Sequence, residues 1–353
     1  MYRNTYAEIN LKNIEENVKK IIKTYSGYKY YFGVVKADCY GHDDLKTVKS
    51  IIRGGCNYLC VATLDEAIEI RKEIKEIPIL CLGVIAKKYI NICKKENITI
   101  TIPSIEYINE LNKTDTENIK VHLKINTGMN RLGIKEKEEL QKTYEIAKNK
   151  KMIIEGIYTH IYEASNEEKY AKQINMFKDI ISCIPQEDIE IIHTSASEAM
   201  SNYNMPKEIN GCRLGIIMYG FTDKKELNLK STFTIKSQVI QINNLKKGET
   251  IGYNGIYEAK ENEKIAVVSI GYADGIIRKN TGRTVYIKGK EYLIVGNICM
   301  DMLFVKVDNN VKIYDEVEIL KDIEHIENVA KYLDTIPYEI LCTIGKRVPR
   351  IYK

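Results

Sequence analysis

The hydrophobic positions of this chain follow two alternating patterns over its first two thirds. Short runs of apolar, mostly β-branched residues predict strands, and the stretches between them carry apolar residues at helical spacing. Residues 6–11 alternate like a strand, and helices are predicted over 11–24, over 44–53 and after Thr63, which forms a capping box with Glu66. Eight further strands are predicted at residues 31–36, 57–62, 77–83, 98–102, 120–126, 152–160, 189–194 and 212–218.

These eight strands indicate an α/β fold. Strands this apolar are expected where helices cover both faces of a parallel sheet. Eight repeats and the length of the segment favour a (β/α)8 TIM-type barrel, although a doubly wound open sheet would produce nearly the same pattern.

The pattern changes after residue 220. A polar linker over 223–230 precedes short alternating strands separated by Gly and Asn turns, which predict a second, mostly β domain. We expect domains over 1–225 and 226–353, with residues 1–10 available to pack against the second. The strands are predicted at 231–242, 264–272, 283–299, 302–307 and 316–320, with one helix at 323–333.

Composition narrows the class of protein. The 353 residues contain 53 Lys and Arg against 48 Asp and Glu, and this net charge of +5 is spread along the chain, so nucleic-acid binding is not indicated. Nine cysteines without a Cys-x-x-Cys pair, and an opening without an apolar core, predict a reducing cytoplasm. The longest apolar stretch, 77–86, is too short to cross a membrane. Five histidines without paired-ligand spacing predict no metal site.

Residues 31–36 predict an apolar strand that ends on Lys36, after which the chain turns through Gly41 towards a helix. A lysine there must reach water or a charged partner, and its functional alternative is an amine that forms a Schiff base with an aldehyde cofactor. The strand alone favours the structural interpretation. However, residues 34–37 (Val-Val-Lys-Ala) and 40–42 (Tyr-Gly-His) resemble the cofactor-lysine motif of the alanine racemase family, which are pyridoxal-phosphate enzymes with a (β/α)8 barrel and a β domain. The resemblance assigns Lys36 and Tyr40 to the cofactor.

Residues 122–133 resemble the same family. The resemblance implies that Arg131 hydrogen-bonds the phenolic oxygen of the cofactor and helps to hold the substrate carboxylate, a task suited to a planar guanidinium. Lys124 matches a lysine that many members carry as a carbamate, which positions that arginine. Asn126 stands where the family commonly has Asp.

Three later motifs are also similar to the family. In residues 156–160, His160 matches a histidine that packs against the cofactor ring. In residues 193–197, Ser197 matches a phosphate-binding serine, and Ala196 replaces an asparagine. In residues 212–220, Arg213 matches the arginine that donates to the pyridine nitrogen, and Gly215 and Ile216 match the backbone positions that bind phosphate. An arginine keeps its proton, so it leaves the pyridine nitrogen unprotonated and weakens the electron sink.

The second domain contributes the remaining motifs. Residues 268–275 resemble the family's second catalytic motif, in which Tyr272 is the base on the face opposite the lysine and reaches the active site of the partner subunit. Residues 296–301 place Met300 against the substrate carboxylate, with Asn297 where the family usually has Arg. Tyr338 matches a tyrosine that binds phosphate and limits the size of the pocket.

Together these resemblances imply a cytoplasmic, homodimeric racemase that interconverts L- and D-alanine with Lys36 and Tyr272 as its two bases, for peptidoglycan synthesis. A serine or broader amino-acid racemase is the alternative, and a non-catalytic pyridoxal-phosphate-binding protein is a further one. A decarboxylase of the same architecture has different lysine and glycine-rich motifs, and the turn 271–275 argues against it.

Overall fold

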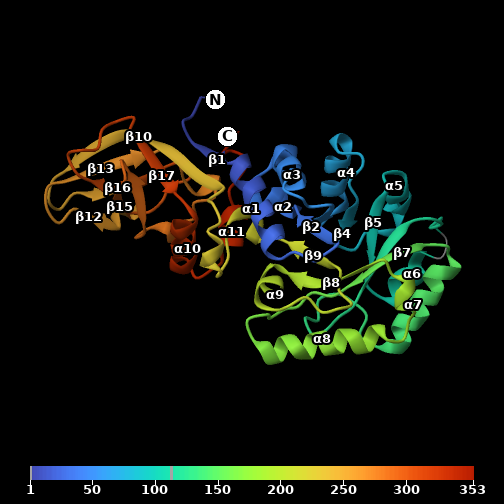
Figure 1. Cartoon of the computed structure of the whole chain (residues 1–353). Helices are drawn as coiled ribbons and strands as arrows, with labels where there is room; N and C mark the ends of the chain where they lie inside the picture. Colours follow the sequence, from blue (N-terminus) through green and yellow to red (C-terminus); the bar gives the residue numbers. More distant parts are fainter. Residues whose placement is uncertain (1, 112–113) are drawn as a thin grey trace.

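The structure is a computed structural model that describes residues 2–111 and 114–353, and it consists of a barrel and a separate β sheet (Figure 1). In the described part of the chain, eight parallel strands close into a barrel because β2 pairs with both β3 and β9. This confirms the predicted barrel and excludes the open sheet. The strands are β2 (Tyr30–Val34), β3 (Tyr58–Val61), β4 (Ile79–Cys81), β5 (Ile98–Ile102), β6 (Lys120–Lys124), β7 (Ile153–Tyr158), β8 (Ile191–Ala196) and β9 (Gly211–Leu214).

Helices surround the barrel and bury one apolar face each. In α1, for example, Ile14, Val18 and Ile21 are buried at helical spacing. The capping box is present, since the Thr63 hydroxyl accepts from Glu66 N and Glu66 accepts from Thr63 N. The barrel helices are α1 (Leu11–Thr24), α3 (Asp44–Arg53), α4 (Leu64–Glu73), α5 (Ile90–Lys95), α6 (Ile105–Glu110), α7 (Lys137–Asn149), α8 (Glu167–Ile181) and α9 (Ser197–Asn202), with short 3-10 turns at Lys87–Tyr89, Gln186–Asp188, Ile216–Tyr219 and Lys225–Leu227.

The segment after β2 is a left-handed turn, α2 (Lys36–Gly41). The four residues that follow Lys36 have φ between 51° and 55°. Non-glycine residues in this conformation cost roughly 1–2 kcal/mol each, so tertiary contacts must hold the turn. Glu66 accepts a 2.7 Å hydrogen bond from Ala37 N. Gly41 lies so close to Leu341 that a Cβ there would be 2.2 Å from its carbonyl oxygen. The expectation that Lys36 ends a strand is therefore wrong, because β2 ends at Val34.

The second part is an eight-stranded sheet, again within the described residues, ordered β13-β16-β15-β14-β17-β10-β1-β18. Here β1 (Tyr6–Ile9), from the start of the chain, pairs antiparallel with β10 and parallel with β18. The other strands are β10 (Phe233–Leu245), β13 (Glu263–Val268), β14 (Thr284–Ile287), β15 (Lys290–Val295), β16 (Leu303–Val307), β17 (Glu316–Leu320) and β18 (Arg350–Tyr352), besides the small pair β11 (Thr250–Ile251) and β12 (Tyr257–Glu258).

Helices α10 (Ile323–Tyr332) and α11 (Pro337–Cys342) complete this part, and α11 packs on α2 where the sheet meets the barrel (Figure 1). Two predicted strands were too long: the strand at 264–272 ends at Val268, and 283–299 is a hairpin of β14 and β15. Short 3-10 turns occur at Tyr253–Gly255, Tyr272–Asp274 and Arg278–Asn280. Among the described residues, no helix is both long and apolar enough to span a bilayer.

Candidate active site

A cavity of about 740 Å³ opens at the carboxyl ends of the barrel strands. Parallel strands of a barrel present their following loops at this face, which is where such folds place binding residues. Most of the residues predicted for the site share this cavity, although they come from five strand ends and from α11. Those lining it are Lys36, Tyr40, Lys124, Arg131, His160, Ser197, Arg213, Gly215 and Tyr338.

Arg213 is the buried cation at the base of this cavity, with 4% of its surface exposed. Its Nη1 donates to His193 Nδ1 at 2.7 Å and to the His193 carbonyl at 3.1 Å. Its Nη2 donates to the Thr159 carbonyl at 2.7 Å and to the Thr194 carbonyl at 3.1 Å. Within the described residues Nε makes no hydrogen bond, so it is the donor left for a group in the cavity.

A chain of buried side chains runs from Arg213 through the barrel interior. His193 Nε2 lies 2.9 Å from His122 Nδ1, and His122 Nε2 lies 3.3 Å from Glu155 Oε2. Burial raises the pKa of Glu155, but hydrogen bonds from His122, Lys120 and Tyr58 outweigh it and lower that pKa to about 2. The chain therefore joins a guanidinium at one end to a carboxylate at the other.

The two ends determine where each proton of this chain lies. Arginine can only donate, so His193 Nδ1 accepts and its Nε2 carries the proton that is donated to His122 Nδ1. His122 Nε2 then carries the proton donated to Glu155. Burial lowers the pKa of both histidines, and the positive charge of Arg213 adds to this, so both rings are neutral near pH 7.

Lys124 is a lysine whose amine is neutral near pH 7. Burial, followed by the charges of Arg213 and Arg131, lowers its pKa to about 6. Its Nζ donates to the Ile125 carbonyl at 2.9 Å and lies over the Tyr158 ring. The same causes, led by burial, lower the pKa of His160 to about 3, so this ring is also neutral.

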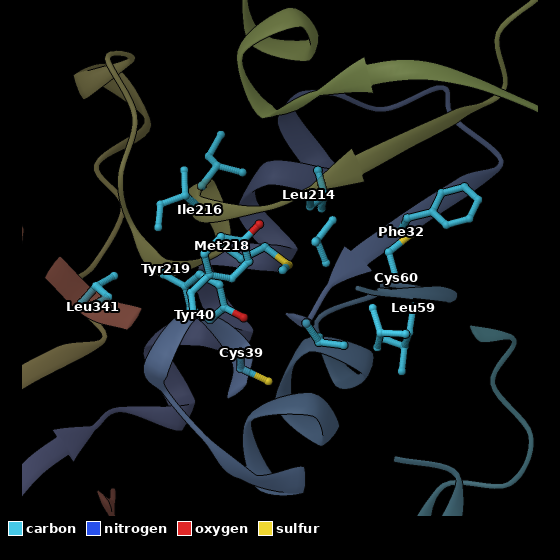
Figure 2. Close-up of a cluster of buried hydrophobic side chains, with 14 of the residues drawn as sticks. Phe32, Cys39, Tyr40, Leu59, Cys60, Leu214, Ile216, Met218, Tyr219 and Leu341 are labelled. Carbon is cyan, nitrogen blue, oxygen red and sulfur yellow. The ribbon is translucent and has the colours of Figure 1, made fainter. Parts of the chain in front are cut away.

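A cradle of backbone and hydroxyl donors forms beside Gly215. Its N–H donates to Ser197 Oγ at 3.1 Å, and a Cβ at this glycine would lie 3.1 Å from Tyr40 Oη. The Tyr40 ring is positioned by Tyr219 and Tyr338, at 5.4 and 5.7 Å between ring centroids. Figure 2 shows Tyr40 above the buried Cys39 and beside Met218 and Tyr219, so apolar packing fixes its place.

Tyr272 and Met300 are not part of the cavity of their own chain. They lie on two adjoining loops of the β sheet, where Tyr272 N donates to the Cys299 carbonyl and Ala273 N donates to the Met300 carbonyl, both at 3.0 Å. The two side chains are exposed, at 41% and 51%. Asp274 anchors the Tyr272 turn from below through two hydrogen bonds from Arg3.

Comparison with known families assigns both parts of the chain. Residues 9–223 match the family model "Alanine racemase, N-terminal domain", and residues 232–352 match "Alanine racemase, C-terminal domain". The chain belongs to the alanine racemase family. Alanine racemase 1 of Bacillus subtilis (strain 168) is 36% identical in an alignment of 366 positions, which covers 99% of this chain and 93% of that protein.

Solved structures of alanine racemases superpose closely on this chain. Alanine racemase from Bacillus anthracis with bound L-Ala-P is 32% identical with a TM-score of 0.93, covering 100% of this chain and 96% of that one. Alanine racemase from E. faecalis is 32% identical with a TM-score of 0.94, covering 100% and 99%. A histidine racemase from Leuconostoc mesenteroides, 23% identical with a TM-score of 0.89 and coverage of 100% and 98%, shares the fold.

Membership of the alanine racemase family implies pyridoxal phosphate, and the cavity fits this group. It offers a lysine amine for an aldehyde, the unused Nε of Arg213 for a ring nitrogen, and hydroxyl groups around Gly215 for a phosphate. A larger residue at Gly215 would make a tight contact with Tyr40 Oη, which would have to shift by a few tenths of an ångström.

The residues that depart from the family pattern have structural partners. Asn126 Oδ1 accepts from the backbone N–H groups of Gly128 and Asn130, so it closes the turn before Arg131. Asn297 accepts a 2.6 Å hydrogen bond from Arg278 and donates to the Tyr253 carbonyl. Ala196 begins α9 without a side-chain cap.

Sequence analysis did not assign the interior residues His122, His193, Glu155 and Tyr158. Their signal was a polar side chain in an otherwise apolar strand of β6, β7 or β8. All four residues are buried, and β7 shifts its register against β6 between Ile154 and Gly156, so simple alternation along the sequence does not give the direction of both Glu155 and Tyr158. Tyr158 lies beneath both Lys124 and Arg213, with cation-to-centroid distances of 4.9 and 5.5 Å.

The hydrogen-bond chain predicts one tautomer for both interior histidines. In two-bond 1H–15N spectra of protein labelled with 15N-histidine, His122 and His193 should show protonated Nε2 and bare Nδ1 at pH 7, because Arg213 cannot accept a proton and Glu155 stays ionised. Substituting His42, His160 and His325 with Gln assigns the remaining signals. An Nδ1–H tautomer or an imidazolium in either ring at neutral pH would contradict the proton order described above.

Proposed function

We propose that this protein interconverts L- and D-alanine with pyridoxal phosphate, using Lys36 and a tyrosine of a second subunit as its two bases. One observation carries the proposal: the cavity gathers a lysine and a set of cofactor-binding residues from one chain, whereas Tyr272 and Met300 lie together on an exposed surface outside it. A symmetric dimer that placed this surface over the partner's cavity would complete two identical sites.

The cavity residues would hold the cofactor as follows. Lys36 would bind its aldehyde carbon, Arg213 Nε would donate to the ring nitrogen, and His160 would flank the ring. The phosphate would lie against Tyr40, Ser197, Gly215, Ile216 and Tyr338. When bound, pyridoxal phosphate draws electron density from the Cα of an attached amino acid and so acidifies its Cα–H.

Two bases are the simpler solution, because the Cα proton must leave one face and return to the other. A single base would have to cross the substrate plane, whereas bases on opposite faces need no such movement. The Lys36 amine serves one face, and Tyr272 of the partner subunit serves the other. Arg131 and the backbone of the partner's Met300 hold the substrate carboxylate, so that each base meets the Cα–H in line.

For the domain organisation we propose a boundary after residue 225, with residues 1–10 belonging to the second unit. The match of the two family models to 9–223 and 232–352 supports this boundary. The pairing of β1 with β10 and β18 supports the assignment of the first strand to the β domain.

Alanine is the proposed substrate, because Tyr338 narrows the cavity and the relatives that match the whole chain are named alanine racemases. Product D-alanine would serve peptidoglycan synthesis in the cytoplasm. A serine or broader-specificity racemase is the second candidate. It is favoured by Asn297, which stands where an arginine is expected along the access path and accepts a hydrogen bond from Arg278. The presence of Tyr272 argues against a non-catalytic pyridoxal-phosphate-binding protein, because such a protein needs no second base.

A shared site predicts that two inactive variants restore activity together. Lys36→Ala and Tyr272→Phe should each lose racemisation, and a mixed dimer should contain one intact site, formed by Lys36 of one chain and Tyr272 of the other. Equal mixing after subunit exchange should therefore recover about a quarter of wild-type activity. The rate of D-alanine formation measures it, with each variant mixed with itself as the control. No recovery, despite mixed dimers shown by native mass spectrometry, would mean that each site is built from one chain.

We also propose that Lys124 carries a carbamate, which its neutral amine can form by adding to carbon dioxide with release of one proton. Because its pKa is about 6, the carbamate should be present above pH 6 and be lost as the pH falls below it. With 13C-bicarbonate, NMR at pH 8 should show a carbamate carbon in the wild type and in the exposed-lysine control Lys142→Met, but not in Lys124→Met. The same signal in Lys124→Met would assign it elsewhere.

A further inference from the structure

A second cavity, of about 200 Å³, lies in the β domain and has no role in the proposed reaction. It is bounded by the segment 275–280, by the end of α10 and by α11. Its wall is largely aliphatic, with one cation: Ile277, Arg283, Leu320, Val329, Leu333 and Ile340.

Arg283 is buried beside this cavity with 5% of its surface exposed. Its Nε donates to Asn280 Oδ1 at 2.6 Å, and its Nη1 donates to the carbonyls of Thr284 and Ile319 at 2.9 and 3.0 Å. Its Nη2 is buried and has no hydrogen-bond partner within the described residues. Two N–H donors of a guanidinium are therefore left unused at the cavity, where an unpaired donor costs free energy.

The charge of Arg283 has no counter-ion in the described part of the chain. Burial lowers its pKa to about 10, which still leaves it protonated near pH 7. Two carboxylates, Asp334 and Glu339, line the exposed rim, but neither forms an ion pair with Arg283, and Glu339 accepts from the Thr335 hydroxyl. His325 adds no charge, since burial and the nearby Arg283 lower its pKa to about 4. A buried cation without an anion is costly unless a ligand supplies one.

From this arrangement we propose that the cavity binds a short-chain aliphatic carboxylate, with its carboxylate on Nη2 of Arg283 and its hydrocarbon chain against Leu320, Val329 and Leu333. An apolar cavity of roughly 150 Å³ accommodates a benzene molecule, so a cavity of 200 Å³ has room for a ligand with the length of butyrate. The aliphatic wall explains why a carboxylate with an apolar tail fits better than a bare inorganic anion.

This ligand would contact two segments that the proposed function also uses. Gly275 and Ile276 of the cavity wall follow the turn of Tyr272, and Ile340 and Thr343 follow Tyr338 on α11. A ligand in this cavity would contact both the segment after Tyr272 and α11. The site does not depend on the proposed function, because none of its residues lines the barrel cavity.

Calorimetric titration of the complete, cofactor-loaded protein with sodium butyrate tests the site. Wild type should bind butyrate, and Arg283→Met should bind it at least about tenfold more weakly, because a charge-assisted hydrogen bond is lost. Val329→Phe, which fills the cavity and keeps every Arg283 hydrogen bond, should abolish the same binding. Lys312→Met removes an exposed cation of the same domain and should change nothing. Carboxylate binding in the barrel cavity would persist in both variants and is thereby separated from this site.

Two further titrations test whether the site requires both a carboxylate and an apolar tail. Butan-1-ol, which has the tail without the charge, should bind more weakly than butyrate, and sodium chloride should not displace butyrate at equal concentration. Butyrate affinity that is unchanged in Val329→Phe, equal affinity for butan-1-ol, displacement by chloride, or no butyrate binding in the wild type would each overturn the assignment. If Arg283→Met fails to fold, the Val329→Phe comparison decides alone.

Discussion

The buried charge of Arg213 is the constraint on which the rest of the barrel site depends. Three backbone carbonyls and His193 surround its terminal nitrogens, and this leaves only Nε to face the cavity. The same charge helps to lower the pKa of Lys124 to about 6 and the pKa of His160 to about 3. Two neutral imidazoles link Arg213, over three hydrogen bonds, to Glu155, which is itself ion-paired with Lys120. Because a guanidinium keeps its proton, it can orient a ring nitrogen without protonating it.

In the proposed function, the two parts of the fold divide the chemistry between them. The barrel brings binding groups from distant strands to one face, which is a property of parallel barrels in general. The β domain holds Tyr272 on a turn that backbone hydrogen bonds and the buried Asp274 make rigid, yet it presents that residue away from its own cavity. A residue needed on one face of the substrate is thus supplied by a surface that only a second subunit can bring into place, which makes assembly and activity inseparable in the proposed function.

Periodicity predicted most of the architecture, since α1, α3, β5 and β17 have the predicted bounds and the barrel has the predicted strand order. It failed where distant contacts override local preference. The left-handed turn after Lys36 depends on Glu66 and on the approach of Leu341, neither of which is local in sequence. Nine of the site residues that the motifs predicted line one cavity. The motifs did not reveal Glu155, because a polar residue in an apolar strand gives no indication of its partner until the barrel closes. They did not reveal Arg283 either, because it lies outside the motifs, just before β14 of the second domain.

Chiral chromatography shows whether the protein racemises alanine. Purified protein with added pyridoxal phosphate would be incubated separately with L-alanine, L-serine and L-lysine, and the D enantiomer of each would be measured over time. If alanine is the substrate, D-alanine forms fastest and the reaction approaches an equal mixture of enantiomers. Faster conversion of serine or lysine would contradict the proposed substrate, and the absence of any D enantiomer from a protein that visibly binds the cofactor would contradict the proposed activity itself.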